Sequence, residues 1–300
     1  MPHVTKLALA LLLMMGAAPG PRNFRVLALA GLPAGQAAGP ATFRTAAANA
    51  PDIPFTDFDA SAEQLLLALA NQARRDAGVP PLAIDAGLSQ AARAHAEVMV
   101  AARQLSHRLD GEPTLPQRLA EATNTKLDQE GENVAFDYDA EHGHQHLMLS
   151  PPHRANLLNA AYNVVGLGVL RSGNHIYIVQ DFGHALPNYS ADEVKDRIAS
   201  AIAQARHQSR LPDLSRIDLA NADEAACSMA EADKLGTLPI HQLAQHYTVL
   251  TYTSLHPETL PANSGHAFAG HNLHSVSIGA CYARTNTYPT GAYWVVLALD

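Results

Sequence analysis

The stretch GENVAF, residues 131–136, places a glutamate between a glycine and an asparagine, directly ahead of an apolar run. A carboxylate in such a position requires polar partners, because burying an unpaired charge is costly. Glu132 has two compatible interpretations. It faces a polar cleft, or it accepts hydrogen bonds from nearby backbone N–H groups and fixes a loop.

Two histidines are the candidate partners of Glu132. His107 lies in LSHRLDG and His153 in SPPHRANLL, so only the fold can bring the three side chains together. Two imidazoles and a carboxylate suit several tasks: binding a transition metal, general base catalysis, or a plain buried ion pair. The residues by themselves leave these three alternatives open.

The hydrophobic pattern around these residues predicts three helices followed by a hairpin. Apolar residues recur at helical spacing over 61–78, 86–104 and 139–149, and two strands are predicted over 164–171 and 175–183 around the turn SGN. Helices first and a hairpin last indicate an α+β sandwich and not a doubly wound sheet.

The last third of the chain has its own pattern. Ser190 precedes Glu193 at the capping-box spacing and opens a helix, so 187–210 is predicted to be a linker helix. Residues 211–300 then predict a smaller α+β domain, with a helix at 222–236 and strands at 246–254, 275–284 and 291–299. In this domain a histidine is followed by a strand, a turn and an aromatic-rich strand, and the latter half of the first domain has the same order. The similarity suggests that the second domain is a degenerate copy of half of the first.

The N-terminus predicts an exported protein. Residues 1–38 combine Lys6, short apolar runs and small residues typical of a signal peptide, with Met14 or Met15 as alternative starts and a mature chain beginning near Ala38. Residues 39–61 are expected to be a flexible lead-in. Neither apolar run reaches the roughly 20 residues needed to span a bilayer, and no cysteine follows that could carry a lipid.

Composition narrows the class of protein. The chain is 47% hydrophobic, which suits a packed core, and its net charge of −8 without a basic run argues against nucleic-acid binding. Cys227 and Cys281 form one disulfide in an exported protein or remain two buried thiols, and the sequence leaves both open.

Five stretches together resemble a known family. They are LLALANQARRDAGVPPLAID, ARAHAEVMVAARQLSH, GENVAF, LSPPHRANLL, and GLGVL followed by YIVQDFG. In the order and spacing of these stretches, residues 62–186 resemble a CAP (or SCP) domain of the bacterial secreted type. This resemblance implies an α-β-α sandwich, the fold of cysteine-rich secretory proteins, antigen 5 and pathogenesis-related 1 proteins. Asn71, Arg74, Gln180 and Asp181 match family positions that are expected to be architectural.

The resemblance implies a cleft with a tetrad of two histidines and two glutamates. Its histidines fall on His107 and His153 and one glutamate falls on Glu132, while Ser150 stands nearest the place of the other. The resemblance permits a metal, with His107, His153 and Glu132 as ligands and zinc as the candidate ion. Losing one carboxylate weakens that expectation, because one negative charge is missing.

The resemblance favours a binding module over an enzyme. The expected ligand is a lipid, glycan or protein of the cell envelope or the extracellular space, and the alternative is a metal-dependent hydrolase that uses the same cleft. His142 and His146 in EHGHQH share a helix face at a chelating spacing, but with no third ligand apparent they are interpreted as a solvated face. The expected location is the periplasm or the medium.

Overall fold

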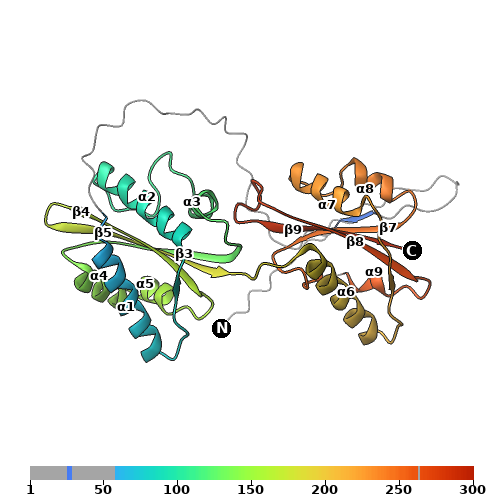
Figure 1. Cartoon of the computed structure of the whole chain (residues 1–300), viewed down its shortest axis with the longest axis horizontal. Helices are drawn as coiled ribbons and strands as arrows, with labels where there is room; N and C mark the ends of the chain where they lie inside the picture. Colours follow the sequence, from blue (N-terminus) through green and yellow to red (C-terminus); the bar gives the residue numbers. More distant parts are fainter. Residues whose placement is uncertain (1–25, 29–57, 263) are drawn as a thin grey trace, which may run out of the picture.

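The computed structural model describes residues 26–28, 58–262 and 264–300. These residues form two layered units, each built on its own sheet (Figure 1). The first unit covers 58–185 and the second covers 190–300 together with a short N-terminal strand. The predicted signal peptide and lead-in fall almost entirely outside the described residues.

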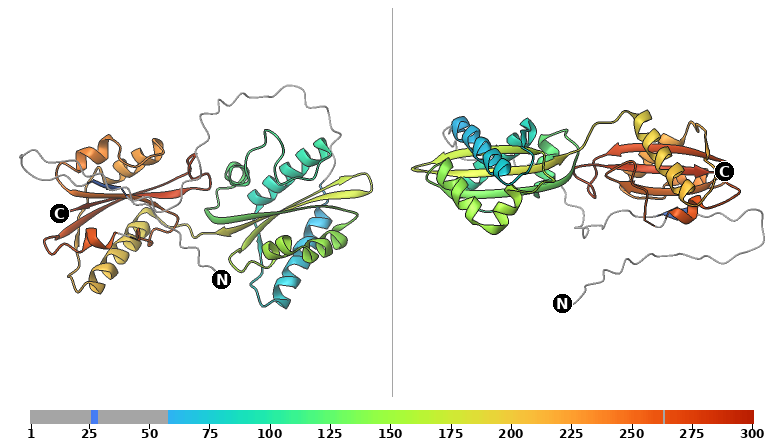
Figure 2. Two further views of the ribbon diagram at one scale, coloured as in Figure 1. Left: turned by 180° about the vertical axis from the view of Figure 1, so that it is seen from behind. Right: turned by 90° about the horizontal axis from the view of Figure 1, so that it is seen from below.

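The first unit is a four-stranded sheet with helices on both faces. Its strands follow the order β2-β4-β5-β3; β2 runs parallel to β4, and the other neighbours are antiparallel. Helices α2 and α3 cover one face, and α1, α4 and α5 cover the other (Figures 1 and 2). In chain order the elements are α1 (Ala60–Asp76), β2 (Ala83–Ile84), α2 (Ala86–Ala102), α3 (Leu115–Ala122), β3 (Leu127–Asp137), α4 (Ala140–Leu149), α5 (Pro151–Leu157), β4 (Val164–Ser172) and β5 (His175–Ala185).

Helix α1 is anchored by a buried arginine. Leu66 and Ala70 pack in the core, and Arg74 follows on the same face without exposed surface. Its guanidinium donates to four backbone carbonyls, those of Pro80, Leu157, Asn159 and Tyr162. These hydrogen bonds compensate for the burial of the charge and hold α1 against the loops that flank α5.

Helix α2 lies very close to strand β4. A Cβ built on Gly166 would lie 2.0 Å from the backbone of Leu88, and one on Gly168 would lie 2.4 Å from that of Ala92. Only glycine permits such an approach, so GLGVL fixes α2 on the sheet and thereby positions the loop that carries His107.

Two short helices lie outside the three helices that the sequence predicts for this unit. Residues 115–122 form α3, because Thr114 and Gln117 make a capping box ahead of it. Pro151 and Pro152 begin α5, because proline fits the first helical turn.

The second unit repeats the strand arrangement of the first. Leaving β1 aside, its sheet has the order β7-β9-β8-β6, with β6 parallel to β8 and the other neighbours antiparallel. Helices α7 and α8 cover one face, and α6 and α9 cover the other (Figure 1). The elements are α6 (Ala191–Gln208), β6 (Ser215–Arg216), α7 (Ala222–Glu231), α8 (Leu238–Leu243), β7 (Thr248–Ser254), α9 (Gly265–Phe268), β8 (Ser275–Ala283) and β9 (Ala292–Leu299).

The helix predicted within 187–210 is present as α6, with its capping box at Ser190 and Glu193. Val194, Ile198 and Ile202 of α6 are buried in one hydrophobic cluster with Tyr252 and Leu297 of the second sheet. Helix α6 therefore packs on the second unit. The sequence could not show this contact, because an amphipathic helix shows which face is buried without showing what covers it.

A further strand lies inside the predicted signal peptide. Strand β1 (Val26–Ala28) pairs in parallel with β7 and forms the edge of the second sheet. Cleavage near Ala38 would remove β1 and leave β7 as the edge strand.

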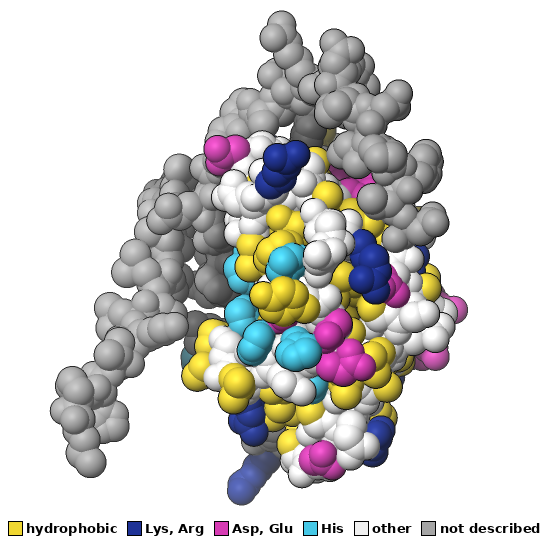
Figure 3. Space-filling model, turned by 90° about the vertical axis from the view of Figure 1, so that its left-hand side faces the viewer, with side chains coloured by type: hydrophobic (Ala, Val, Ile, Leu, Met, Phe, Trp, Pro, Cys, Tyr) yellow, Lys and Arg dark blue, Asp and Glu magenta, His cyan; other side chains and the backbone are white. Residues whose placement is uncertain are grey.

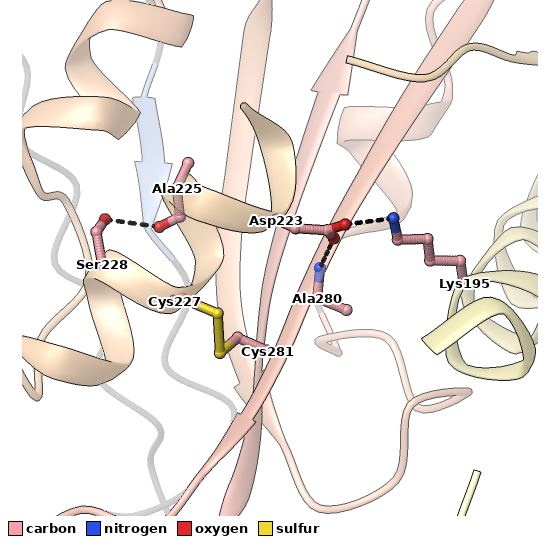
Figure 4. The surroundings of a disulfide bond; sticks show 7 residues. All are labelled: Lys195, Asp223, Ala225, Cys227, Ser228, Ala280 and Cys281. Carbon is pink, nitrogen blue, oxygen red and sulfur yellow. Dashed lines mark hydrogen bonds and ion pairs between the residues drawn. A yellow bond between two sulfur atoms is a disulfide. The ribbon is translucent and has the colours of Figure 1, made fainter. Parts of the chain in front are cut away.

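The two cysteines form a disulfide in the second unit. Cys227 on α7 and Cys281 on β8 have Cα atoms 5.1 Å apart (Figure 4). Beside them, Asp223 accepts a hydrogen bond from the Ala280 N–H at 3.1 Å and pairs with Lys195 of α6 at 2.6 Å. These links join α6, α7 and β8.

Candidate functional site

The fold brings His107, Glu132 and His153 together from three separate elements. Glu132 lies on β3, His107 in the loop after α2, and His153 on α5. Nδ1 of His107 lies 2.9 Å from Oε1 of Glu132, and the two imidazole rings lie 6.4 Å apart between centroids. The side chain of Glu132 is 3% exposed, whereas that of His107 is 59% exposed. The carboxylate therefore supports an imidazole that remains open to solvent.

Both oxygens of Glu132 are already engaged. Oε1 faces His107, and Oε2 accepts from the guanidinium of Arg118 on α3, which also donates to the His107 carbonyl at 3.1 Å. Since a carboxylate only accepts, Nδ1 of His107 carries the proton in this pair. The neutral form of His107 then presents an unprotonated Nε2.

A second histidine–carboxylate pair lies behind the first and was missed by the sequence analysis. His95 on α2 is fully buried, with Nδ1 at 2.6 Å from Glu112 Oε1 and Nε2 at 2.9 Å from the Ser106 carbonyl. Oε2 of Glu112 accepts from the backbone N–H of Leu109. His95 thus fixes the segment just before His107. The sequence feature that could have pointed to this pair is Glu112, an acidic residue in the same loop as His107.

Asp181 is the other buried carboxyl group of the site. It lies on β5 directly opposite Glu132, and neither of its oxygens has a hydrogen-bond partner within the described chain. Burial, reinforced by the charge of Glu132, holds the pKa of Asp181 well above its usual range. This residue was expected to be architectural, but its chemistry is that of a proton-binding group beside the cleft.

His153 lies on α5 across from His107, with its ring centroid 6.4 Å from that of His107. Its carbonyl accepts from the Asn133 side chain, which also bonds Gln180, so α5 is fastened to the sheet next to Glu132. Burial, and then the neighbouring His107, lower the pKa of His153. An imidazole kept neutral in this way accepts or donates a hydrogen bond near neutral pH.

Ser150 does not join this cluster through hydrogen bonds. It lies between α4 and α5 as the N-cap residue of α5, and its side chain makes no capping hydrogen bond. Within the described residues, no hydrogen bond connects it to His107, Glu132 or His153. The carboxyl groups that lie close to the predicted site, besides Glu132 itself, are those of Glu112 and Asp181.

The donor set does not fit a metal in this arrangement. Within residues 58–262 and 264–300, no group of three or more His, Cys, Asp or Glu side chains is placed to hold an ion. Both oxygens of Glu132 already have partners, Arg118 at Oε2 and His107 at Oε1. A cation is disfavoured next to a fixed guanidinium.

Two of the three EHGHQH histidines, His142 and His146, are each paired with an aspartate and make no contact with His107, Glu132 or His153 among the hydrogen bonds of the described residues. His142 contacts Asp139 at 2.8 Å and His146 contacts Asp137 at 2.5 Å. Figure 3 shows histidines gathered with hydrophobic and acidic side chains at the end of the molecule where the β4–β5 turn lies. This agrees with the interpretation of a solvated face.

The comparison with known families decides the identity of the first unit. Residues 67–182 match the model of the cysteine-rich secretory protein family, CAP. The first unit is a CAP domain. No curated protein matches the chain. No helix of the described residues is long and apolar enough to cross a membrane.

Solved structures similar to this chain come from bacteria and animals, and three bacterial ones cover the CAP domain. An outer surface protein of Borrelia burgdorferi is 22% identical over 42% of this chain and 95% of its own, with a TM-score of 0.40. An extracellular SCP-domain protein of Bacillus anthracis is 29% identical over 41% and 40%, with a TM-score of 0.37. A cysteine-rich secretory protein of Staphylococcus aureus is 21% identical over 41% and 39%, with a TM-score of 0.33.

Proposed function

We propose that the CAP domain is a non-catalytic binding module whose cleft, formed by His107, Glu132 and His153, takes a ligand of the cell envelope or the extracellular space. The observation that carries this proposal is the His107–Glu132 pair, in which a buried carboxylate fixes a solvent-exposed imidazole. A side chain fixed in this way loses little conformational entropy when a ligand binds.

The same contacts argue against the metal-dependent hydrolase. A general base needs a carboxylate oxygen free to take a proton from water. Both oxygens of Glu132 are occupied, one by His107 and the other by Arg118. The buried ion pair fixes Glu132 as a support for the cleft and not as its reactive group.

The ligand chemistry that best fits the two imidazoles is an anionic group. His107 and His153 flank the cleft with their ring centroids 6.4 Å apart, a distance that a phosphate or carboxylate can bridge. Because burial and His107 lower the pKa of His153, an anion would favour its protonation. Affinity for an anion should therefore increase as the pH falls.

We also propose that the second unit is a second CAP-type unit without the cleft. Arg206 on α6 donates to the carbonyls of Pro212 and Phe268, as Arg74 on α1 donates to those of Pro80 and Leu157. A Cβ on Gly279 would lie 2.0 Å from the first residue of α7, which parallels the close approach of Gly166 to α2.

The sheet register supports this proposal, because the acidic positions of the first unit are not acidic in the second. In the first unit Asp181 on β5 pairs with Gly166 and Glu132. In the second, Val296 on β9 pairs with Gly279 and Thr251, so Val296 and Thr251 take the two acidic positions. The corresponding region is filled by an apolar cluster that includes Trp294.

Export to the periplasm or the medium is part of the proposal. The signal-like residues 1–38 support it, and so does the Cys227–Cys281 disulfide, because such bonds persist in oxidising compartments.

The proposal is tested by co-sedimentation of the exported protein with isolated cell-wall sacculi and with vesicles of phosphatidylglycerol or phosphatidylcholine. We expect binding to sacculi or to anionic vesicles that is lost in His107→Ala/His153→Ala and retained in the control His142→Ala/His146→Ala. Binding that both double variants retain, or equal binding to both kinds of vesicle, would contradict the proposal.

A further inference from the structure

A small cavity of about 200 Å³ lies where the two units meet. The first unit contributes Lys126, which immediately precedes β3, and the second contributes aromatic side chains from β8 and β9. The start of β3 and the end of β5 both point toward the second unit (Figure 1). The complete lining is Lys126, Tyr189, Ala191, Val194, Ala280, Tyr282 and Tyr293.

Lys126 is a half-buried cation without an acidic partner. Its Nζ lies 4.1 Å from the centroid of the Tyr282 ring and donates to the Tyr293 hydroxyl at 3.0 Å. In the described chain it forms no ion pair with a carboxylate, whereas Lys195 pairs with Asp223. An ammonium group has three donors, so Lys126 keeps hydrogen-bonding capacity for a ligand. Burial lowers its pKa.

The aromatic walls are fixed in place. Tyr282 and Tyr293 pack edge to face with ring centroids 5.0 Å apart, and the Tyr282 hydroxyl donates to the Thr290 carbonyl. The Arg197 guanidinium stacks 3.8 Å from the centroid of the Tyr189 ring. The cavity therefore has aromatic walls and one cation in its lining, Lys126, while a second cation, Arg197, lies behind Tyr189. No residue of the lining is acidic.

We propose that this cavity binds a small aromatic carboxylate, with its ring against the tyrosines and its carboxylate on Lys126. A planar anion satisfies the unpaired ammonium and stacks on the aromatic rings at once. A volume of about 200 Å³ lies below the ~300 Å³ at which sites for drug-sized ligands begin. The ligand therefore has a single ring. This site is independent of the His107 cleft.

A purely structural role for Lys126 makes a different prediction. Arg284 also links the units by donating to the Ala120 and Thr125 carbonyls, and His256 contacts Asp128. If Lys126 were only one more such link, the cavity would take no carboxylate, and Lys126→Met would change only the association of the two units.

The test is calorimetric titration of the exported full-length protein with benzoate, benzamide and cyclohexanecarboxylate. We expect saturable one-to-one binding of benzoate, with at least tenfold weaker binding of the other two. Lys126→Met should weaken benzoate binding at least tenfold, and the control Lys195→Met should leave it unchanged.

A second variant covers the case in which Lys126→Met separates the units. Ala280→Leu fills the cavity from β8 without altering Lys126, and we expect it to abolish benzoate binding while the thermal unfolding midpoint stays within a few degrees of wild type. No saturable binding to wild type, or unchanged binding by Ala280→Leu, would overturn the proposal.

Discussion

Arg118 and Glu132 form a buried ion pair in the CAP domain beneath the exposed His107, with side chains only 6% and 3% exposed. The pair joins α3 to β3, and through the other oxygen of Glu132 it positions His107. Arg118 thus neutralises the charge of Glu132, and the imidazole of His107 is the group that remains exposed to solvent.

Removing Arg118 should strongly destabilise the CAP domain. Arg118→Met leaves Glu132 buried without its cation, and we expect a loss of about 3–5 kcal/mol in the free energy of unfolding, measured with urea. The matched control is Arg171→Met, since the Arg171 side chain is 59% exposed and its partner Asp59 keeps the hydrogen bond from the Ala62 N–H, so that the loss should be at most about 1 kcal/mol. Equal losses in the two variants would refute this account of the pair.

Zinc should not bind tightly in the cleft. Because the Arg118 cation occupies Glu132, chelator-treated wild type should bind zinc no more tightly than His107→Ala/His153→Ala in calorimetry. His142→Ala/His146→Ala controls for adventitious binding at the exposed pair. Tight one-to-one zinc binding that is lost only in His107→Ala/His153→Ala would contradict this prediction, because it would mean that zinc can displace Arg118 from Glu132.

Asp181 should make the CAP domain less stable as the pH rises. Its raised pKa means that the folded state holds a proton that the unfolded chain releases near its ordinary pKa of 3.8. The folded state then binds more protons, so stability falls as the pH increases above that value. We expect Asp181→Asn to be more stable than wild type, by a margin that grows between pH 5 and pH 8 in urea unfolding.

A control for this prediction is Asp110→Asn, which changes an exposed aspartate in the loop before α3. It should show no such trend. A constant difference between Asp181→Asn and wild type at all pH values would mean that Asp181 is ionised in the folded protein.

Helix α6 should be required for the second unit to fold. Its Ile198 and Ile202 are buried against the second sheet, so a fragment of residues 187–300 should unfold cooperatively, whereas 211–300 should not. Thermal unfolding followed by circular dichroism distinguishes the two fragments. If the fragment 211–300 unfolded cooperatively with the same thermal midpoint as 187–300, α6 would be a linker that the second unit does not need for folding.

The sequence was sufficient for the parts of the fold that short motifs encode. GLGVL, GENVAF and HRANLL identified the CAP domain, and the resemblance singled out His107, Glu132 and His153, whose side chains lie close together in the structure. Asp181 lies in a matched motif, but its proton-binding character arises only because β5 buries it opposite Glu132.

Residues that act through long-range contacts were not predictable in the same way. His95 lies in an alanine-rich helix and Arg118 in a segment for which the sequence predicted no helix, and neither shows a spacing that points to Glu132. Strand β6 was also missed, because it has only two residues and its pairing with β8 depends on the folded sheet.

The most direct test of the central claim follows the histidine ring signals by nuclear magnetic resonance during titration with glycerol phosphate and with N-acetylmuramate. The binding-module account predicts that the ring signals of His107 and His153 shift saturably with at least one of these anions, more strongly at pH 6 than at pH 8, while those of His142 and His146 stay in place. Cleft signals that respond to neither anion would contradict it.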